Sequence, residues 1–379
     1  MLWRMTAAEG TATGQAPAQK KRVPFWDNAR FASITLVVIG HGIQRLTADS
    51  DHALVLYLFI YAFHMPAFAM ISGYFSKSSS PGQRQMMKVI TDIIIPYLIM
   101  ETIWTAVQFA IAGTLNFNPS TPSWTLWFLL ALGIFRLILP YLALLRWPLA
   151  WAVLFSVAIG YFANVDNTFS LSRAIGILPF FVLGWKVRHW GIVDRWRVID
   201  RPAWFVRGGA VIVLGSWLAV VWVFITEFRE FGLQLWFFYD DSYSAIGEGE
   251  WWSGFVRLGL MALAVILSAA FFVLIPRSNT WMTGFGQSTM YIYLLHSFVL
   301  FPLRETGILR GEHSSAMWLV SMVFASIAIS IVLASPWVRW LFRPLIEPRP
   351  RWLFARMDDA QVKDNKPKPR VDPTGSRRD

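Results

Sequence analysis

Long apolar blocks recur along the whole chain, and they constrain its fold more than any other feature of the sequence. Blocks of about 17–25 apolar residues are what a membrane-spanning helix requires. Only helices and closed barrels satisfy their backbone hydrogen bonds in lipid, and continuous blocks favour helices over alternating strands. We expect ten helices, at about 31–46, 54–75, 89–112, 124–145, 149–163, 174–187, 209–227, 255–275, 288–303 and 317–340.

Composition agrees with an all-α, polytopic membrane protein. Of the 379 residues, 55% are hydrophobic and 15% charged, and the mean hydropathy is +0.46. The net charge of +11 lies mainly in the tails and in alternate connecting segments, which is typical of membrane orientation and not of nucleic-acid binding. No cysteine is present, so disulfides and thiolate chemistry are excluded.

The signs of the charges in the connecting segments predict the side of the membrane that each segment faces. Lys77, Lys88 and Arg277 belong to basic segments, whereas Asp51 and Glu230 belong to the acidic segments that alternate with them. Basic residues concentrate on the cytoplasmic side of membrane proteins, which here places both termini in the cytoplasm. That placement requires an even number of spans, and ten satisfies it.

Three regions are expected along the chain. Residues 1–24 are polar and small, without the apolar core of a signal peptide, and predict a disordered cytoplasmic tail. Residues 25–345 form the membrane domain. Residues 346–379 are charged and contain prolines, so they predict a second cytoplasmic tail that buries no core.

Three histidines fall within apolar blocks. A helix rises about 1.5 Å per residue, which places His41, His64 and His296 at similar depth near the middle of the membrane. An imidazole in the apolar interior of a membrane needs a hydrogen-bonding or charged partner. A neutral imidazole is also the usual general base near neutral pH. We expect a polar, partly hydrated chamber; the alternative is a structural hydrogen bond for each histidine. The other histidines are expected at the surface: His52, His189 and His313.

Arg30 precedes His41 by eleven residues on the first expected helix. Eleven residues turn a helix by about 1100°, roughly 20° past three full turns, and rise about 16 Å, so the two side chains share one face. A phosphate-bearing donor could dock on Arg30 at the cytoplasmic mouth of a groove that leads to His41. Spacing alone favours the plainer alternative, an interfacial arginine that anchors the helix.

The longest acidic segment, from about 228 to 253, is rich in aromatic and acidic residues. One interpretation is a loop held on the membrane surface by Trp236 and Trp251. The other is a platform for a sugar-like acceptor, since aromatic faces and carboxylates suit carbohydrate binding. The sequence has no Walker loop, G-x-G-x-x-G, C-x-x-C or H-E-x-x-H, so neither a nucleotide motif nor a metal site is predicted.

Five segments carry a resemblance to a known family. WDNARFASITLVVIGH has a basic residue, ten residues and then a histidine; FHMPAFAMISGYF is the second segment; Arg84 and Lys88 precede IIIPY; SWTLWFLLALGIFRLILP and YIYLLHSFV follow. In this order, from about residue 25 to 300, they resemble acyltransferase family three, the membrane O-acyltransferases, and in particular its fucose 4-O-acetylase-like branch.

The resemblance implies about ten helices that move an acyl group from cytoplasmic acyl-CoA to a hydroxyl, often on a cell-envelope or secreted glycan. It makes His41 the essential histidine and Arg30 its paired cation. The resulting hypothesis is O-acetylation of a sugar hydroxyl at the cell membrane, with His41 as general base and direct acyl-histidine formation as a variant. His64 or His296 would polarise the thioester or orient His41. The expected acetyl-CoA contacts are Arg30, Arg84, Lys88, Ser72 and Gly73.

Several alternatives stay open at this point. Gly73 could serve close helix packing instead of passage of the donor, and Glu101 could pair with a histidine or face the outer interface. The acceptor could be a small secreted metabolite. The chain could also be a proton-coupled transporter or flippase with a histidine relay, or a membrane scaffold. A transporter would carry protons or ions without releasing coenzyme A.

Overall fold

The computed structural model describes residues 22–79, 82–113, 115, 117–165, 168–199, 203–247, 249–305, 316–348 and 353, with the backbone alone at Arg84, Ala112 and Ala203. These residues form helices and no strand, which confirms the expected all-α class. Seven helices in this part of the chain are long and apolar enough to cross a membrane. The protein is therefore a polytopic membrane protein. Most of the two expected tails, 1–24 and 346–379, lies outside the described residues.

The described helices follow the apolar blocks in order. The blocks are occupied by α1 (Pro24–Ile43), α2 (Asp51–Tyr61) with α3 (His64–Phe75), α4 (Gln83–Val89) with α5 (Ile95–Ala112), α6 (Trp127–Leu142), α7 (Pro148–Ile159), α8 (Leu171–His189), α10 (Ala203–Val223), α13 (Ser253–Leu274), α14 (Thr289–Glu305) and α15 (Ala316–Leu333). A π-helical turn, Ile90–Ile94, joins α4 to α5 just before Pro96, which has no N–H to donate. The shorter elements are η1 (Gln44–Ala48), η3 (Thr168–Ser170), α9 (Ile192–Val198), α11 (Ile225–Glu230), α12 (Leu233–Trp236), η4 (Thr283–Ser288) and α16 (Pro336–Ile346).

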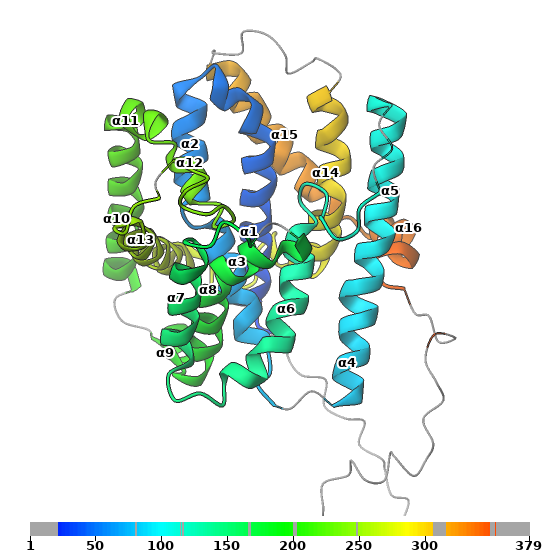
Figure 1. Cartoon of the computed structure of the whole chain (residues 1–379), viewed down its shortest axis with the longest axis horizontal. Helices are drawn as coiled ribbons and strands as arrows, with labels where there is room; N and C mark the ends of the chain where they lie inside the picture. The colour runs from blue at the N-terminus through cyan, green and yellow to red at the C-terminus, as the bar shows by residue number, and fades with distance from the viewer. Residues whose placement is uncertain are drawn as a thin grey trace, which may run out of the picture.

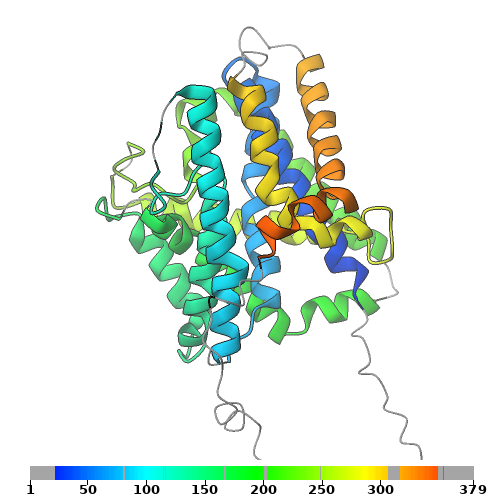
Figure 2. The same ribbon diagram turned by 90° about the vertical axis from the view of Figure 1, so that its right-hand side faces the viewer.

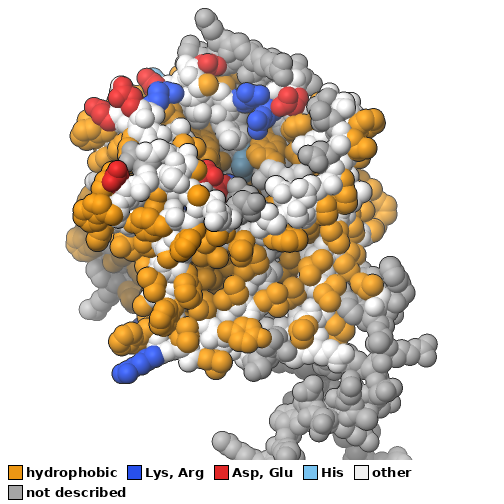
Figure 3. Space-filling view, in the orientation of Figure 1, with side chains coloured by type: hydrophobic (Ala, Val, Ile, Leu, Met, Phe, Trp, Pro, Cys, Tyr) orange, Lys and Arg blue, Asp and Glu red, His pale blue; other side chains and the backbone are white. Residues whose placement is uncertain are grey.

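Most successive runs alternate in direction, whereas α13 lies across the bundle, and the bundle has two distinct ends (Figure 1; Figure 2). The end at the top of Figure 1 carries η1, α11 and α12, and we call it the outer end because its connecting segments are acidic. The opposite end carries α9 and the start of α4, and we call it the inner end. On the face drawn in Figure 3, a broad apolar belt lies below the charged side chains of the outer end, as a membrane-spanning bundle requires.

Helices α3 and α8 pack through a reciprocal pair of glycines. A side chain at Gly73 would overlap the Phe181 carbonyl, and one at Gly184 would overlap the Met70 carbonyl. Lipid provides no hydrophobic drive for helices to associate, so close backbone approach at small residues supplies the contact. Gly73 therefore serves helix packing, one of the two roles expected for it.

Among the helix boundaries that differ from expectation, two have a direct physical cause. Helix α1 begins at Pro24 and not near residue 31, because the polar side chains of its first turns find partners inside the protein. The helix expected at 317–340 is broken. Helix α15 ends at Leu333, Ser335 is extended, and α16 starts at Pro336, where proline fits the first helical turn but cannot continue a preceding one.

The segment at 228–253 folds onto the bundle at the outer end. Trp236 is buried and stacks with Phe231 and Tyr243, so its expected role as a surface anchor is wrong. Trp251 is 74% exposed and keeps that expectation open. The aromatic residues of this segment are thus divided between its own core and the surface.

Candidate active site

The structure brings the three intramembrane histidines together. The imidazole of His41, near the outer end of α1, lies 5.5 Å from that of His296 on α14, measured between ring centroids. The Tyr61 ring lies between the other pair, 6.4 Å from His41 and 4.5 Å from His64. Helices far apart in the sequence therefore bring the three histidines into one cluster, near the outer end of α1.

The three histidines differ in their exposure. His64 is 2% exposed and His296 is fully buried, whereas His41 is partly exposed. Figure 3 shows a hollow near the outer end with a histidine on its floor and charged side chains around it. A reacting group must be reachable by its substrate, so His41 is the one of the three with the accessibility that chemistry requires.

Each of the two buried histidines bonds to a carbonyl one turn earlier in the chain, His64 to α2 and His296 within α14. Nδ1 of His64 and Nδ1 of His296 each lie 3.0 Å from the carbonyl oxygen four residues earlier. A carbonyl can only accept, so each neutral ring carries its proton on Nδ1 and a lone pair on Nε2. Nε2 of His296 is buried without a hydrogen bond of ordinary geometry, and so is Nδ1 of His41. The neighbouring rings of His41 and His296 thus offer a complementary donor and acceptor.

Glycines on both sides of His41 let other helices approach it. A Cβ at Gly40 would lie 2.8 Å from the Tyr61 ring, and one at Gly42 would overlap the Ser326 hydroxyl of α15. Any larger residue at Gly40 would push Tyr61 away from His41. The sequence G-H-G therefore lets α2 and α15 pack close to α1 at the depth of the histidine.

Trp124 covers the chamber from the loop before α6. Its ring lies 5.3 Å from the His41 ring, and its φ of 34° is unusual for a bulky residue. The preceding Ser123 is fixed by Glu101 of α5, whose carboxylate accepts its N–H at 3.0 Å and its hydroxyl at 2.6 Å. Glu101 is 1% exposed and holds this turn, which differs from both roles expected for it.

An arginine–aspartate pair joins the start of α8 to the segment after α12. Arg173, in the first turn of α8, forms an ion pair with Asp240, which follows α12 in the chain. The guanidinium carbon of Arg173 lies 4.6 Å from the Trp127 ring centroid and 5.7 Å from that of Phe238. Its charge is close enough to act electrostatically on His41. We call the partly exposed group of His41, Trp124, Trp127, Arg173 and Phe238 the outer recess.

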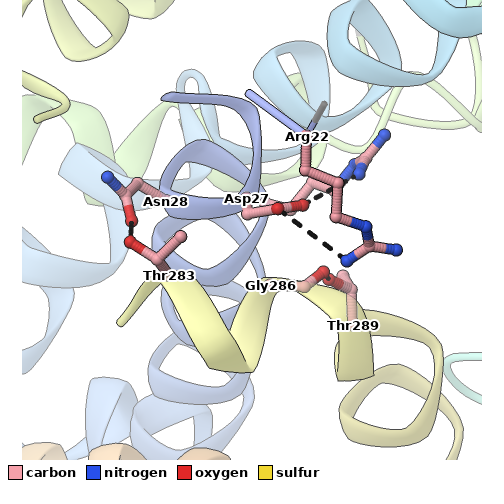
Figure 4. A network of polar contacts seen from close by, with 7 residues as sticks. Arg22, Asp27, Asn28, Thr283, Gly286 and Thr289 are labelled. Carbon is pink, nitrogen blue, oxygen red and sulfur yellow. Dashed lines mark hydrogen bonds and ion pairs between the residues drawn. The ribbon is translucent and has the colours of Figure 1, made fainter. Parts of the chain in front are cut away.

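The inner end of α1 is a different polar cluster (Figure 4). The Asp27 carboxylate pairs with Arg30 at 3.3 Å and lies 3.9 Å from Arg22. Asn28 is fully buried, donates to the carbonyls of Pro276 and Ser278, and accepts from the hydroxyls of Thr280 and Thr283. These bonds tie the start of α1 to the segment around η4.

The other residues expected to bind the donor are distributed along the inner half. Arg30 packs over the Phe75 ring at 4.2 Å and stays partly exposed, and Lys88 is exposed. The Ser72 hydroxyl donates to the Phe68 carbonyl within α3. The side chain of Arg84 lies outside the described residues.

The face of α1 between Arg30 and His41 is packed. Ile34 and Val37 lie on that face, at 0% and 4% exposure, against neighbouring helices. The described residues therefore show no open groove between Arg30 and His41, although their spacing suggested one.

An apolar cavity of about 280 Å³ lies between α5, α14, α16 and the end of α15. Its lining includes Met100, Leu295, Phe298 and Phe342 and contains no polar side chain. This cavity suits an alkyl chain and offers no group for proton transfer or phosphate binding.

Sequence reasoning missed Trp124, Arg173 and Asp240. Arg173 precedes the expected helix 174–187 by one residue, and a charge at the edge of an apolar block was the signal that could have identified it. Asp240 is 67 residues away from Arg173 and becomes its partner only through the fold. The surface positions expected for His52 and His189 agree with the structure, whereas His313 lies outside the described residues.

Comparison with known families adds one finding. The family described as an acyltransferase domain matches residues 23–335, which includes both ends of α1 and all three clustered histidines. Comparison with curated proteins and with solved structures gives no match.

Proposed function

The chain belongs to the acyltransferase-3 family and is a membrane acyltransferase, and from this premise we propose that it is an O-acetyltransferase of the cell membrane. It moves an acetyl or other short acyl group from cytoplasmic acyl-CoA to a hydroxyl of a sugar or cell-envelope glycan. The observation that supports this proposal most is the chamber itself: one partly exposed histidine, His41, backed by two buried ones. Assignment to the fucose 4-O-acetylase-like branch is part of the proposal.

His41 is the general base in this proposal. As the acceptor oxygen attacks the thioester carbonyl, His41 takes the hydroxyl proton and a tetrahedral intermediate forms. The carbon–sulfur bond then breaks, and the departing thiolate receives the proton from the imidazolium. The products are an ester of the acceptor and free coenzyme A, and His41 returns to its neutral form.

His296 orients His41. Its Nε2 lone pair lies on a ring 5.5 Å from the His41 ring. Nδ1 of His41 makes no hydrogen bond of ordinary geometry, and the Gln44 side chain is another polar group that lies close to His41. A hydrogen bond from Nδ1 of His41 to Nε2 of His296 would leave Nε2 of His41 unprotonated, as a base requires. His64 is separated from His41 by Tyr61 and has the weaker claim to this role.

The donor binds at the inner end. Arg30, with Lys88 or Arg84, holds the coenzyme phosphates, because guanidinium and ammonium groups are the usual partners of phosphate. The reactive thioester must then reach about 16 Å along α1 to His41. Because Ile34 and Val37 fill the face between them, entry of the pantetheine arm requires these side chains to move.

Product identification tests the proposal. The purified protein in lipid nanodiscs is incubated with labelled acetyl-CoA and a pool of hydroxylated envelope and secreted compounds, and labelled products are identified by mass spectrometry. We expect coenzyme A release that depends on the pool and an acetyl ester on a sugar. An ester on a small metabolite would change the acceptor class. Proton-dependent solute flux in vesicles, without any coenzyme A release, would establish a transporter instead.

A further inference from the structure

The buried polar atoms of the Arg173–Asp240 pair point to a ligand that the fold alone does not supply. Asp240 is 7% exposed, and only one of its carboxylate oxygens is paired with Arg173. The other oxygen, Oδ1, is buried without a hydrogen bond, and so is Nε of Arg173. Leaving such groups unpaired costs about 1–3 kcal/mol each, and more when they are charged.

The segment that carries Asp240 packs against α8 with backbone strain and an unpaired buried hydroxyl group. Tyr239 has a φ of 58°, a strained value for an aromatic residue, and its hydroxyl is also buried without a partner. Its carbonyl occupies the space that a side chain at Gly176 would fill, so the segment lies directly on the helix that carries Arg173. The packing thus fixes an incompletely bonded ion pair beside the histidines.

The unpaired atoms select a neutral, hydroxylated ligand. A hydroxyl group can donate to Oδ1 of Asp240 and accept from Nε of Arg173, so neighbouring hydroxyls of a sugar satisfy both. A carboxylate or phosphate cannot donate to Oδ1 and is repelled by Asp240, and an ammonium cannot accept from Nε. The ion pair is close to neutral overall, which removes the attraction that an anionic ligand would need.

We propose that Arg173 and Asp240 form the acceptor subsite, which holds a neutral polyhydroxylated acceptor such as a sugar in the outer recess beside His41. This assignment rests on the proposed acetyl-transfer function and adds to it the residues and the charge class that select the acceptor. Trp127 and Phe238 fix the guanidinium plane of Arg173, so the pair is preorganised before the acceptor arrives.

The test compares acceptor and donor dependence in the full-length protein in nanodiscs. The probes are methyl glycosides of neutral hexoses and of 6-deoxyhexoses, with methyl glucuronide as the anionic counterpart and labelled acetyl-CoA as donor. We expect transfer to at least one neutral glycoside in preference to the glucuronide. Arg173→Lys and Asp240→Asn should each raise the acceptor concentration at half-maximal rate at least tenfold. The acetyl-CoA dependence should change less than twofold.

Arg229→Gln is the matched control, because Arg229 forms an exposed ion pair with Asp51 at the same outer end. It should leave both dependences unchanged. If Asp240→Asn does not fold, Arg173→Lys carries the test, since it keeps the charge and the partner. The proposal is overturned if the Arg173 and Asp240 variants behave like the control, as sites filled only by water would, if donor and acceptor dependences shift together, or if the glucuronide is preferred.

A binding measurement separates failure of the subsite from failure of the proposed function. Thermal stabilisation by the neutral glycosides is measured without any donor, in the wild type and in Arg173→Lys. Stabilisation that the variant loses supports the subsite even if no glycoside is acetylated, in which case the proposed function fails alone. If no neutral glycoside stabilises the wild type, the subsite assignment fails, whatever the transfer activity.

Discussion

The two ends of α1 both carry buried polar residues, but they differ in how these residues are bonded. At the inner end, Asn28 makes four hydrogen bonds and Asp27 pairs with Arg22 and Arg30. At the outer end, His41 has a buried side-chain nitrogen without a hydrogen bond. Three residues on the elements around it also have a buried side-chain nitrogen or oxygen without one: His296, Arg173 and Asp240.

This difference separates structural polarity from polarity that is available for chemistry. A buried polar group with all its partners stabilises one arrangement of helices, whereas one without partners costs free energy until a ligand or water meets it. By this criterion the inner cluster stabilises the fold. In the proposed function, its partly exposed cation Arg30 binds the donor, and the outer recess holds the reacting groups.

Side-specific labelling should give the largest contrast between the two ends. The chain has no cysteine, so single cysteines can be introduced without a background. We expect a membrane-impermeant thiosulfonate to modify His41→Cys from the same side as Asp51→Cys, an exposed outer position. Arg30→Cys should be modified from the same side as Lys77→Cys, an exposed inner position. Modification of His41→Cys and Arg30→Cys from one common side would contradict the assignment of His41 and Arg30 to opposite ends of the bundle.

Removal of His296 should slow transfer strongly without unfolding the protein. We expect His296→Ala to lower the transfer rate roughly 10²-fold, because His41 loses the hydrogen-bond acceptor, Nε2 of His296, that would fix its tautomer. The measurement is acceptor-dependent coenzyme A release. His64→Ala is the matched control, since His64 is also buried and bonded to the carbonyl four residues earlier but lies beyond Tyr61. Equal losses in both variants would mean that the chamber acts only through packing.

Removal of Asn28 should lower the stability of the protein and leave its transfer rate nearly unchanged, which is the opposite of the effect expected for His296. Asn28→Ala leaves two carbonyls and two hydroxyls without their partner. We expect the free energy of unfolding to fall by about 3 kcal/mol, with the rate per folded molecule within about twofold of wild type. Thermal unfolding in detergent measures the first and coenzyme A release the second. Asn118→Ala, at an exposed asparagine with local hydrogen bonds, should change neither.

The smallest effect is expected for Arg30. Arg30→Ala should raise the acetyl-CoA concentration at half-maximal rate roughly tenfold and leave the maximal rate nearly unchanged, because one phosphate contact is lost. Arg22→Ala is the matched control, since Arg22 lies near the same carboxylate but is 61% exposed. If both variants change the acetyl-CoA concentration at half-maximal rate equally, Arg30 acts only by neutralising the charge of the Asp27 carboxylate.

Sequence patterns that are local predicted most of the architecture. Hydropathy predicted the ten helical runs, and helical spacing predicted a common depth for His41, His64 and His296. The start of α1 was missed because Asp27 and Asn28 look like a loop until their distant partners are known. The break between α15 and α16 was missed although Pro336 signals it.

Pairings between distant segments could not be predicted in this way. Nothing in the sequence links Asp240 to Arg173, or Glu101 to the turn that presents Trp124. Trp236 was expected at the membrane surface because tryptophans favour interfaces, but here it fills the core of the outer segment. Local composition limits the possibilities for such residues, and tertiary packing decides among them.

The most direct test of the central claim, that His41 is the reacting centre, is acetyl transfer by His41→Ala in nanodiscs. His189→Ala serves as the control, because His189 is exposed at the inner end of α8. We predict that transfer and acceptor-dependent coenzyme A release fall roughly 10²–10⁴-fold in His41→Ala. The melting temperature and the acetyl-CoA affinity should stay close to those of the control. Transfer at the wild-type rate by folded His41→Ala would contradict the account.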